Sequence, residues 1–176
     1  MSFYPPNIEK TRLVDLMMAC GEKHLRQRGF VRVTVPRIVP ASGACENVDT
    51  LFEITVGGDP RWFHGGHKRA YFTQTGQLYL ETLLGEKGFE KVYCIGPSAR
   101  AEATIDHRHL TEFEMIEIEF RGTFDQLLEE IELFIGGLIK EVLSIPQEEK
   151  TAYGLPTDFT HLAEPQELKT FPRLNY

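Results

Sequence analysis

The sequence is poor in the features that mark disulfide-linked, zinc-binding and membrane proteins. Its three cysteines, Cys20, Cys45 and Cys94, are odd in number, far apart and not arranged as Cys-x-x-Cys. This pattern argues against a disulfide framework or a structural zinc site, and we expect buried, reduced thiols. No apolar run is long enough to span a bilayer, and the amino terminus has no apolar signal-peptide core. We therefore expect a cytoplasmic protein.

The sequence also has fewer basic than acidic residues. The chain has 19 Lys and Arg against 26 Asp and Glu, a net charge of -7, which argues against broad, non-specific nucleic-acid binding. Its 176 residues, 41% of them hydrophobic, are enough for one domain with a buried core. Two histidine pairs, His64 with His67 and His107 with His109, lack a third ligand nearby, so we expect no metal site in this chain.

Apolar periodicity predicts alternating helices and strands, which places the chain in the α+β class. We predict, in chain order, a helix at 8–28, strands at 31–35, 51–55 and 70–73, a helix at 77–85, a hairpin at 91–120 and a long helix at 123–143. Gly29 and Pro36 end the first helix and strand, and Thr123 with Gln126 forms a capping box before the long helix. Residues 37–49 and 147–176 read as irregular.

The hairpin at 91–120 holds the richest set of chemical groups. Side chains alternate between the two faces of a strand, so Phe113 and Glu117 share one face, while Ile116, Ile118 and Phe120 face the core. Such a surface of Arg, Glu and an aromatic ring suits a phosphate, an amine and a flat base. The alternative is the solvated side of an antiparallel sheet. A long polar loop without Asn-Gly or Gly-Gly favours binding.

The polar segment QTGQ, from Gln74 to Gln77, lies between a predicted strand and a predicted helix. Its side chains either cap the helix or hold a small polar ligand at the end of the strand. The residue pattern leaves both interpretations open.

Three segments together resemble a known family. RGFVRVTVP resembles the first motif of the class II aminoacyl-tRNA synthetases, YFTQTGQLYLE their amino-acid-binding segment, and ARAE with RHLTEFEMIEIE their second motif. The resemblance covers residues 11–176 and is closest to the asparaginyl enzymes of the aspartyl/asparaginyl group. It implies an incomplete catalytic domain, 1–176, with an antiparallel sheet flanked by helices. It also implies a homodimer formed through residues 8–36, and ATP-dependent activation of asparagine followed by transfer to tRNA.

The resemblance also implies roles for individual residues on the ATP side. Arg100 is the catalytic residue, which bridges the ATP α-phosphate and the substrate carboxylate. Glu102 lies near the adenine amino group and Phe113 stacks on the adenine ring. Arg108 and His109 reach the outer phosphates.

On the amino-acid side, the resemblance implies that Glu46 and Gln77 hold the α-amino group and that Glu117 reads the amino acid. Aspartyl enzymes carry a Lys where this chain has Leu80. No cation is then available for an aspartate side chain, which favours asparagine, and Glu117 suits an amide NH2 as an acceptor.

Some features depart from the family pattern. Ala99 replaces an aromatic residue before Arg100, and Asn47 and Val48 replace a Gly pair. The third motif, the Mg²⁺ ligands and an anticodon-binding barrel have no counterpart in the sequence, so we expect this chain to be inactive alone. The alternatives are a non-catalytic paralogue that binds a nucleotide, an amino acid or a partner, and an aspartyl-tRNA ligase or synthetase-derived asparagine synthetase.

Overall fold

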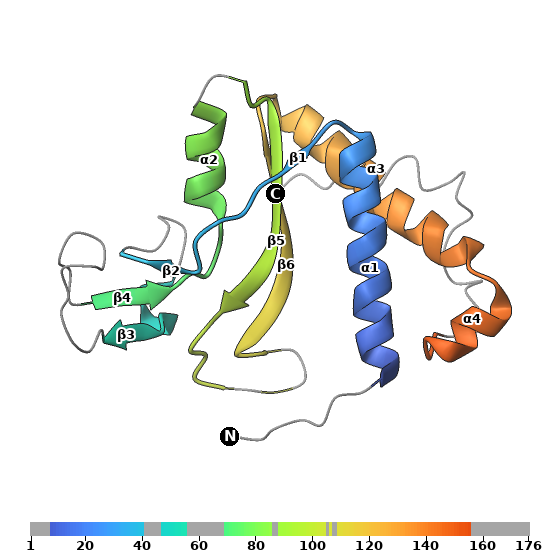
Figure 1. Cartoon of the computed structure of the whole chain (residues 1–176), viewed down its shortest axis with the longest axis horizontal. Coiled ribbons are helices and arrows are strands. Elements are labelled where there is room, and N and C mark those ends of the chain that lie inside the picture. Colours follow the sequence, from blue (N-terminus) through green and yellow to red (C-terminus); the bar gives the residue numbers. More distant parts are fainter. Residues whose placement is uncertain are drawn as a thin grey trace. The chain divides into compact units, whose positions relative to one another are not determined.

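The structure is a computed structural model, and it describes residues 8–40, 47–55, 69–85, 88–104, 106 and 109–155. The chain divides into two compact units, one formed by residues 30–121 and the other by residues 1–29 with 122–176. Figure 1 labels their helices and strands.

The described residues of the unit 30–121 form two small sheets. In the first sheet, β1 pairs in parallel with β5, which pairs antiparallel with β6; these strands are β1 Val31–Arg32, β5 Lys91–Ala99 and β6 Glu112–Phe120. The second sheet is antiparallel in the order β2-β4-β3, formed by β2 Ile38–Val39, β4 Arg69–Phe72 and β3 Glu53–Thr55. A 3-10 helix, η1, spans Val48–Thr50, and α2 spans Gln77–Gly85.

The core of this unit lies between α2 and the β5–β6 hairpin. Leu80 and Leu84, one helical turn apart on α2, form a buried cluster with Val92 and Cys94 of β5. Val33, Val35 and Phe89 pack against this cluster. The helix therefore covers one end of the hairpin by hydrophobic burial.

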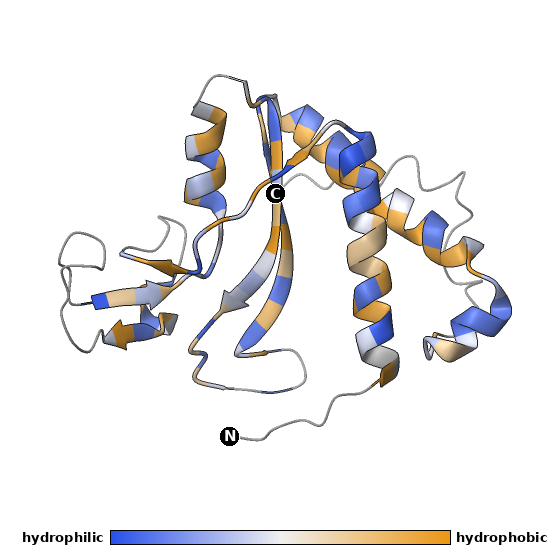
Figure 2. Ribbon diagram, in the orientation of Figure 1, coloured by the Kyte–Doolittle hydropathy of each residue, from blue (hydrophilic) through white to orange (hydrophobic). Residues whose placement is uncertain are grey.

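The hairpin corrects one prediction about which face is buried. Cys94 pairs with Glu117 in the β5–β6 register, so the core cluster lies on the face of Glu117. The opposite face, with Ile116, Ile118 and Phe120, was predicted to be the core face. It does bury Tyr93, the partner of Ile118, but it is not the sole buried face. The reason is that β5 is the central strand of its sheet and is buried on both sides, whereas alternation along β6 (Figure 2) indicated a single buried face.

In the other unit, the described residues form the helices α1 Ile8–Gln27, α3 Phe124–Ser144 and α4 Gln147–Ala152. Gly29, with a φ of 84°, follows the end of α1, as predicted for a helix stop. The predicted capping box is confirmed, because the Thr123 hydroxyl accepts from Gln126 N–H and the Gln126 side chain accepts from Thr123 N–H.

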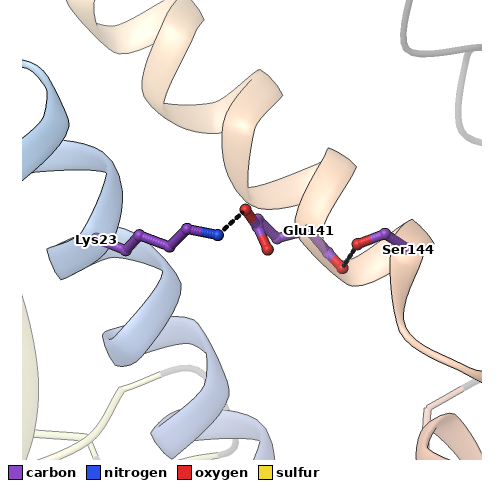
Figure 3. A network of polar contacts seen from close by, with 3 residues as sticks. All are labelled: Lys23, Glu141 and Ser144. Atoms are coloured by element: carbon purple, nitrogen blue, oxygen red, sulfur yellow. Dashed lines mark hydrogen bonds and ion pairs between the residues drawn. The ribbon is translucent and has the colours of Figure 1, made fainter.

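The contact between α1 and α3 uses polar residues in addition to apolar ones. The Arg28 guanidinium donates two hydrogen bonds of 3.0 Å to the buried Glu130 carboxylate. His24 lies edge-on against Phe134. Figure 3 shows Lys23 reaching Glu141, 2.6 Å away, while Ser144 donates to the Glu141 carbonyl. Not all apolar side chains of α3 are buried, since Ile131 and Ile135 are exposed.

Several predictions about element bounds were wrong, including the strand predicted at 51–55, which spans only Glu53–Thr55. The strand predicted at 31–35 stops at Arg32; the Val33 N–H still donates to Tyr93 O. Residues 37–49, predicted irregular, contain β2, which is defined by its pairing with β4 rather than by local pattern.

The segment from 147 contains α4 instead of loop. Glu148 and Glu149 lie in its first turn, where carboxylates interact favourably with the helix dipole. The buried Lys150 amine donates to Leu143 O at 2.9 Å. A six-residue helix is too short to show an apolar period, so it depends on such local contacts.

Within the described part of the chain, no helix combines the length and apolar character that crossing a membrane requires.

The two ion pairs between α1 and α3 are expected to differ in their contribution to stability. Arg28→Ala leaves the buried Glu130 without two hydrogen bonds and should lower the free energy of unfolding by about 2 kcal/mol. Lys23→Ala breaks an exposed pair and should lower the free energy of unfolding much less than Arg28→Ala does. Urea unfolding at neutral pH measures both, and equal losses would contradict this ranking.

Candidate functional site

A polar turn between β4 and α2 holds the carboxylate of Glu117 on β6. Glu117 accepts hydrogen bonds from the Thr75 hydroxyl and, at 2.8 Å, from the Gly76 N–H. The Cys94 thiol lies 3.6 Å from the same carboxylate. Thr75 also accepts from Gln77 N–H at 3.1 Å. The turn is thereby tied both to β6 and to the first residue of α2.

The two glutamines of the QTGQ segment have different environments. The Gln74 side chain is buried and donates to the carbonyl and hydroxyl of Thr50, at 2.8 and 3.0 Å. Ser98 donates to the Gln74 carbonyl at 2.8 Å. Thr75 thus contacts the first residue of α2, as the capping interpretation predicts, whereas Gln74 instead links this segment to Thr50. Gln77, at the start of α2, is half-buried.

Arg100 lies beside Phe113, as the hairpin pattern suggested. The Arg100 guanidinium carbon is 5.6 Å from the centre of the Phe113 ring, a cation–π distance. Its backbone N–H donates to Thr111 O at 2.8 Å, which closes the end of the hairpin. The Arg100 Nε is buried and has no hydrogen-bond partner among the described residues. A buried donor without a partner is costly, and an acceptor on a ligand would satisfy it.

The predicted sharing of one face by Phe113 and Glu117 is confirmed. Phe113 pairs with Ser98, and Glu117 with Cys94. The partners are four residues apart on β5, so all four side chains lie on one face. Glu117 therefore lies nearer the middle of this face, and the Phe113 ring with the Arg100 guanidinium beside it lies toward the hairpin end.

The remaining predicted residues are less closely gathered. Glu102 is half-buried, and His109 is exposed, with its Nδ1 3.0 Å from the Asp106 carboxylate. The His109 backbone N–H also donates to Asp106, at 2.9 Å. Glu46 and Arg108 lie outside the described residues.

Sequence reasoning missed the partners of Glu117. Thr75 and Gly76 belong to a segment that the sequence singled out, but their bonds to Glu117 span more than 40 positions. Cys94 was predicted only to be buried. The Thr-Gly pair before α2 did indicate two hydrogen-bond donors. The sequence alone could not identify their acceptor, because that depends on the sheet register, which brings Glu117 to this turn.

A cavity of about 150 Å³ lies beside Glu117. Its lining includes Arg37, Thr73, Gly76 and Gly96. This space is enough for several water molecules or a small polar group. Leu80, the apolar residue that stands where aspartyl enzymes carry a Lys, is fully buried in the neighbouring core. Among the described residues, no three His, Cys, Asp or Glu side chains gather in a way that could hold a metal ion.

Comparison with known proteins identifies the class of this chain. The family model of class II tRNA synthetases (D, K and N) matches residues 9–176. The chain therefore belongs to this family of aminoacyl-tRNA ligases.

The relatives that it resembles include asparaginyl enzymes. It is 37% identical over 152 residues to an asparagine–tRNA ligase of Koribacter versatilis, covering 85% of this chain and 30% of the relative. The cytoplasmic asparagine–tRNA ligase of Mus musculus is 33% identical, with 92% and 26% covered. The chain thus spans about a third or less of the length of these relatives.

The solved structures include the asparaginyl-tRNA synthetase of Pyrococcus horikoshii complexed with asparaginyl-adenylate. The TM-score is 0.59 with 27% identity, over 83% of this chain and 32% of that one. The asparaginyl-tRNA synthetase of Entamoeba histolytica, with the same ligand, gives a TM-score of 0.60 with 26% identity, over 81% of this chain and 27% of that one. These matches confirm the predicted α+β, class II synthetase-like fold.

The contact between Cys94 and Glu117 predicts a pH dependence. Burial, with the nearby Glu117 charge and hydrogen bond, raises the pKa of the Cys94 thiol from 9.0 to about 12. Above about pH 9 the unfolded thiol ionises while the folded one does not, so the free energy of unfolding should fall as pH rises. The slope should reach about 1.4 kcal/mol per pH unit.

Urea unfolding in reducing buffer, from pH 8 upwards, measures this slope. Cys94→Ala removes the titrating group and should flatten the curve relative to the unsubstituted chain. Parallel curves for the two proteins would show that Cys94 does not titrate in this way.

Proposed function

We propose that this chain forms one wall of a site that activates asparagine with ATP to asparaginyl-adenylate, for transfer to tRNA. The observation that carries the proposal is that Arg100 lies beside Phe113 and that Glu117 shares the face of Phe113 on the β5–β6 hairpin. Asparagine–tRNA ligases among the relatives, and solved relatives holding asparaginyl-adenylate, support it.

The nucleotide would bind at the Arg100 end of this face. A guanidinium matches phosphate and carboxylate oxygens through parallel N–H donors, and Arg100 has a buried Nε available. It would bridge the α-phosphate and the substrate carboxylate and stabilise charge that develops as the adenylate forms. Adenine would stack on Phe113, with Glu102 near its amino group. Arg108 and His109 would reach the outer phosphates.

The amino acid would bind at the Glu117 end. Its α-amino group would contact Gln77 and Glu46, and its side-chain amide would donate to Glu117. The absence of a cation at Leu80 disfavours a second carboxylate, and therefore aspartate. The described residues supply no cluster of three ligands for Mg²⁺, so the roles proposed above are only those of this chain's own groups.

The proposal extends to assembly and location. Val14 and Met17 of α1 are exposed apolar side chains, which support a homodimer contact through residues 8–36. One relative is described as cytoplasmic, in line with a cytoplasmic protein.

The complete gene product that carries this chain should exchange pyrophosphate into ATP in the presence of asparagine. Arg100→Ala should lower kcat/KM by about 100-fold or more, because it removes charge stabilisation in the transition state. Arg69→Ala is the matched control, since Arg69 forms an exposed pair with Glu53; it should stay within about twofold of the unsubstituted protein.

Other outcomes decide between the alternatives. Exchange with aspartate but not asparagine would refute the asparagine assignment. Absence of exchange, together with no binding of ATP or of an asparaginyl-adenylate analogue by calorimetry, would favour a non-catalytic paralogue.

A further inference from the structure

We propose that the Thr75–Gly76 turn is a positioning element that orients the Glu117 carboxylate and so selects an amino acid with a side-chain amide. The inference rests on the proposed function, in which Glu117 faces the amino acid. Its basis is the pair of hydrogen bonds that the turn donates to the two carboxylate oxygens, one to each.

The direction of these hydrogen bonds is set by the turn itself. A backbone N–H only donates, so Gly76 requires an acceptor in Glu117. The Thr75 oxygen already accepts from Gln77 N–H, which leaves its hydrogen for Glu117. Both carboxylate oxygens are therefore held as acceptors.

The lone pairs of Glu117 that the turn leaves free determine which ligand groups can bind there. A carboxylate has about four lone-pair positions. Thr75 and Gly76 use two, and the Cys94 thiol, a weak donor, approaches a third. A ligand group that donates, such as an amide NH2, fits what remains. A ligand carboxylate has no hydrogen to give and is repelled by Glu117.

The close approach of the turn depends on glycine. A Cβ at Gly76 would lie 2.9 Å from Cys94 Sγ and 3.0 Å from Val35 Cγ2, closer than these atoms can tolerate. Without a side chain, the Gly76 backbone can lie directly against the sheet. Gly76 O also accepts from the N–H groups of Tyr79 and Leu80. The turn that holds Glu117 is thus continuous with the first turn of α2.

The test compares three variants of the complete gene product in the pyrophosphate exchange assay. Thr75→Val keeps the shape but removes the hydroxyl, and should raise KM for asparagine about tenfold, the effect of one hydrogen bond to a charged group. We expect kcat and KM for ATP to stay within about twofold, since an interaction made equally in the ground and transition states changes KM. Discrimination against aspartate should fall in parallel.

Two further variants separate positioning from folding. Thr75→Ser retains the hydroxyl and should restore most of the loss. Thr82→Val removes a hydroxyl from the exposed side of α2, where Thr82 bonds only within its helix, and should leave KM for asparagine unchanged. An unchanged KM in Thr75→Val, or an equal rise of KM for ATP, would overturn the inference.

A crystal structure of Thr75→Val gives a readout that does not depend on activity. The Glu117 carboxylate should leave the position that it holds in the unsubstituted protein, and a carboxylate that stays in place would overturn the inference. A complete protein without asparagine-dependent exchange would refute the proposed function, whereas the crystallographic comparison would still decide the role of Thr75.

Discussion

The antiparallel register of β5 and β6 is the constraint on which the rest of this unit depends. It runs without a bulge from Lys91 opposite Phe120 to Ala99 opposite Glu112. Because side chains alternate, a slip of one residue would transfer Glu117 to the opposite face. It would then be separated from Thr75 and Gly76, and Phe113 would be separated from Arg100. The register therefore determines which groups can act together.

One face of this hairpin changes character along its length. At one end, α2 buries Val92 and Cys94 in an apolar cluster. At the other end, Arg100 and Phe113 lie side by side. Glu117 marks the boundary between them, and a carboxylate so close to an apolar core requires hydrogen-bond donors. The turn before α2 supplies these donors, so the helix that closes the core also allows a charged group beside it.

The sequence predicted what is locally determined. The bounds of α2 and of the hairpin, and the capping box of α3, follow from periodicity and short-range hydrogen bonds, and they agree with the structure. The pairing of β2 with β4 and the partners of Glu117 depend on segments far apart in the chain, which one sequence pattern cannot bring together. The alternation of side chains along β6 correctly placed Phe113 and Glu117 on the same face. It did not predict that part of this face is buried, because the position of α2 was unknown.

The two ends of the face also differ in how they are prepared for a ligand. Glu117 is already held by the protein, so binding an amide requires little reorganisation, and a preorganised acceptor discriminates well between an amide and a carboxylate. Arg100 is different, because its buried Nε has no partner among the described residues. An acceptor oxygen there would recover the free energy lost by burying that donor. In the proposed function, selectivity therefore comes from the rigid amino-acid end, whereas the Arg100 end contributes a favourable interaction that forms only when a ligand oxygen arrives.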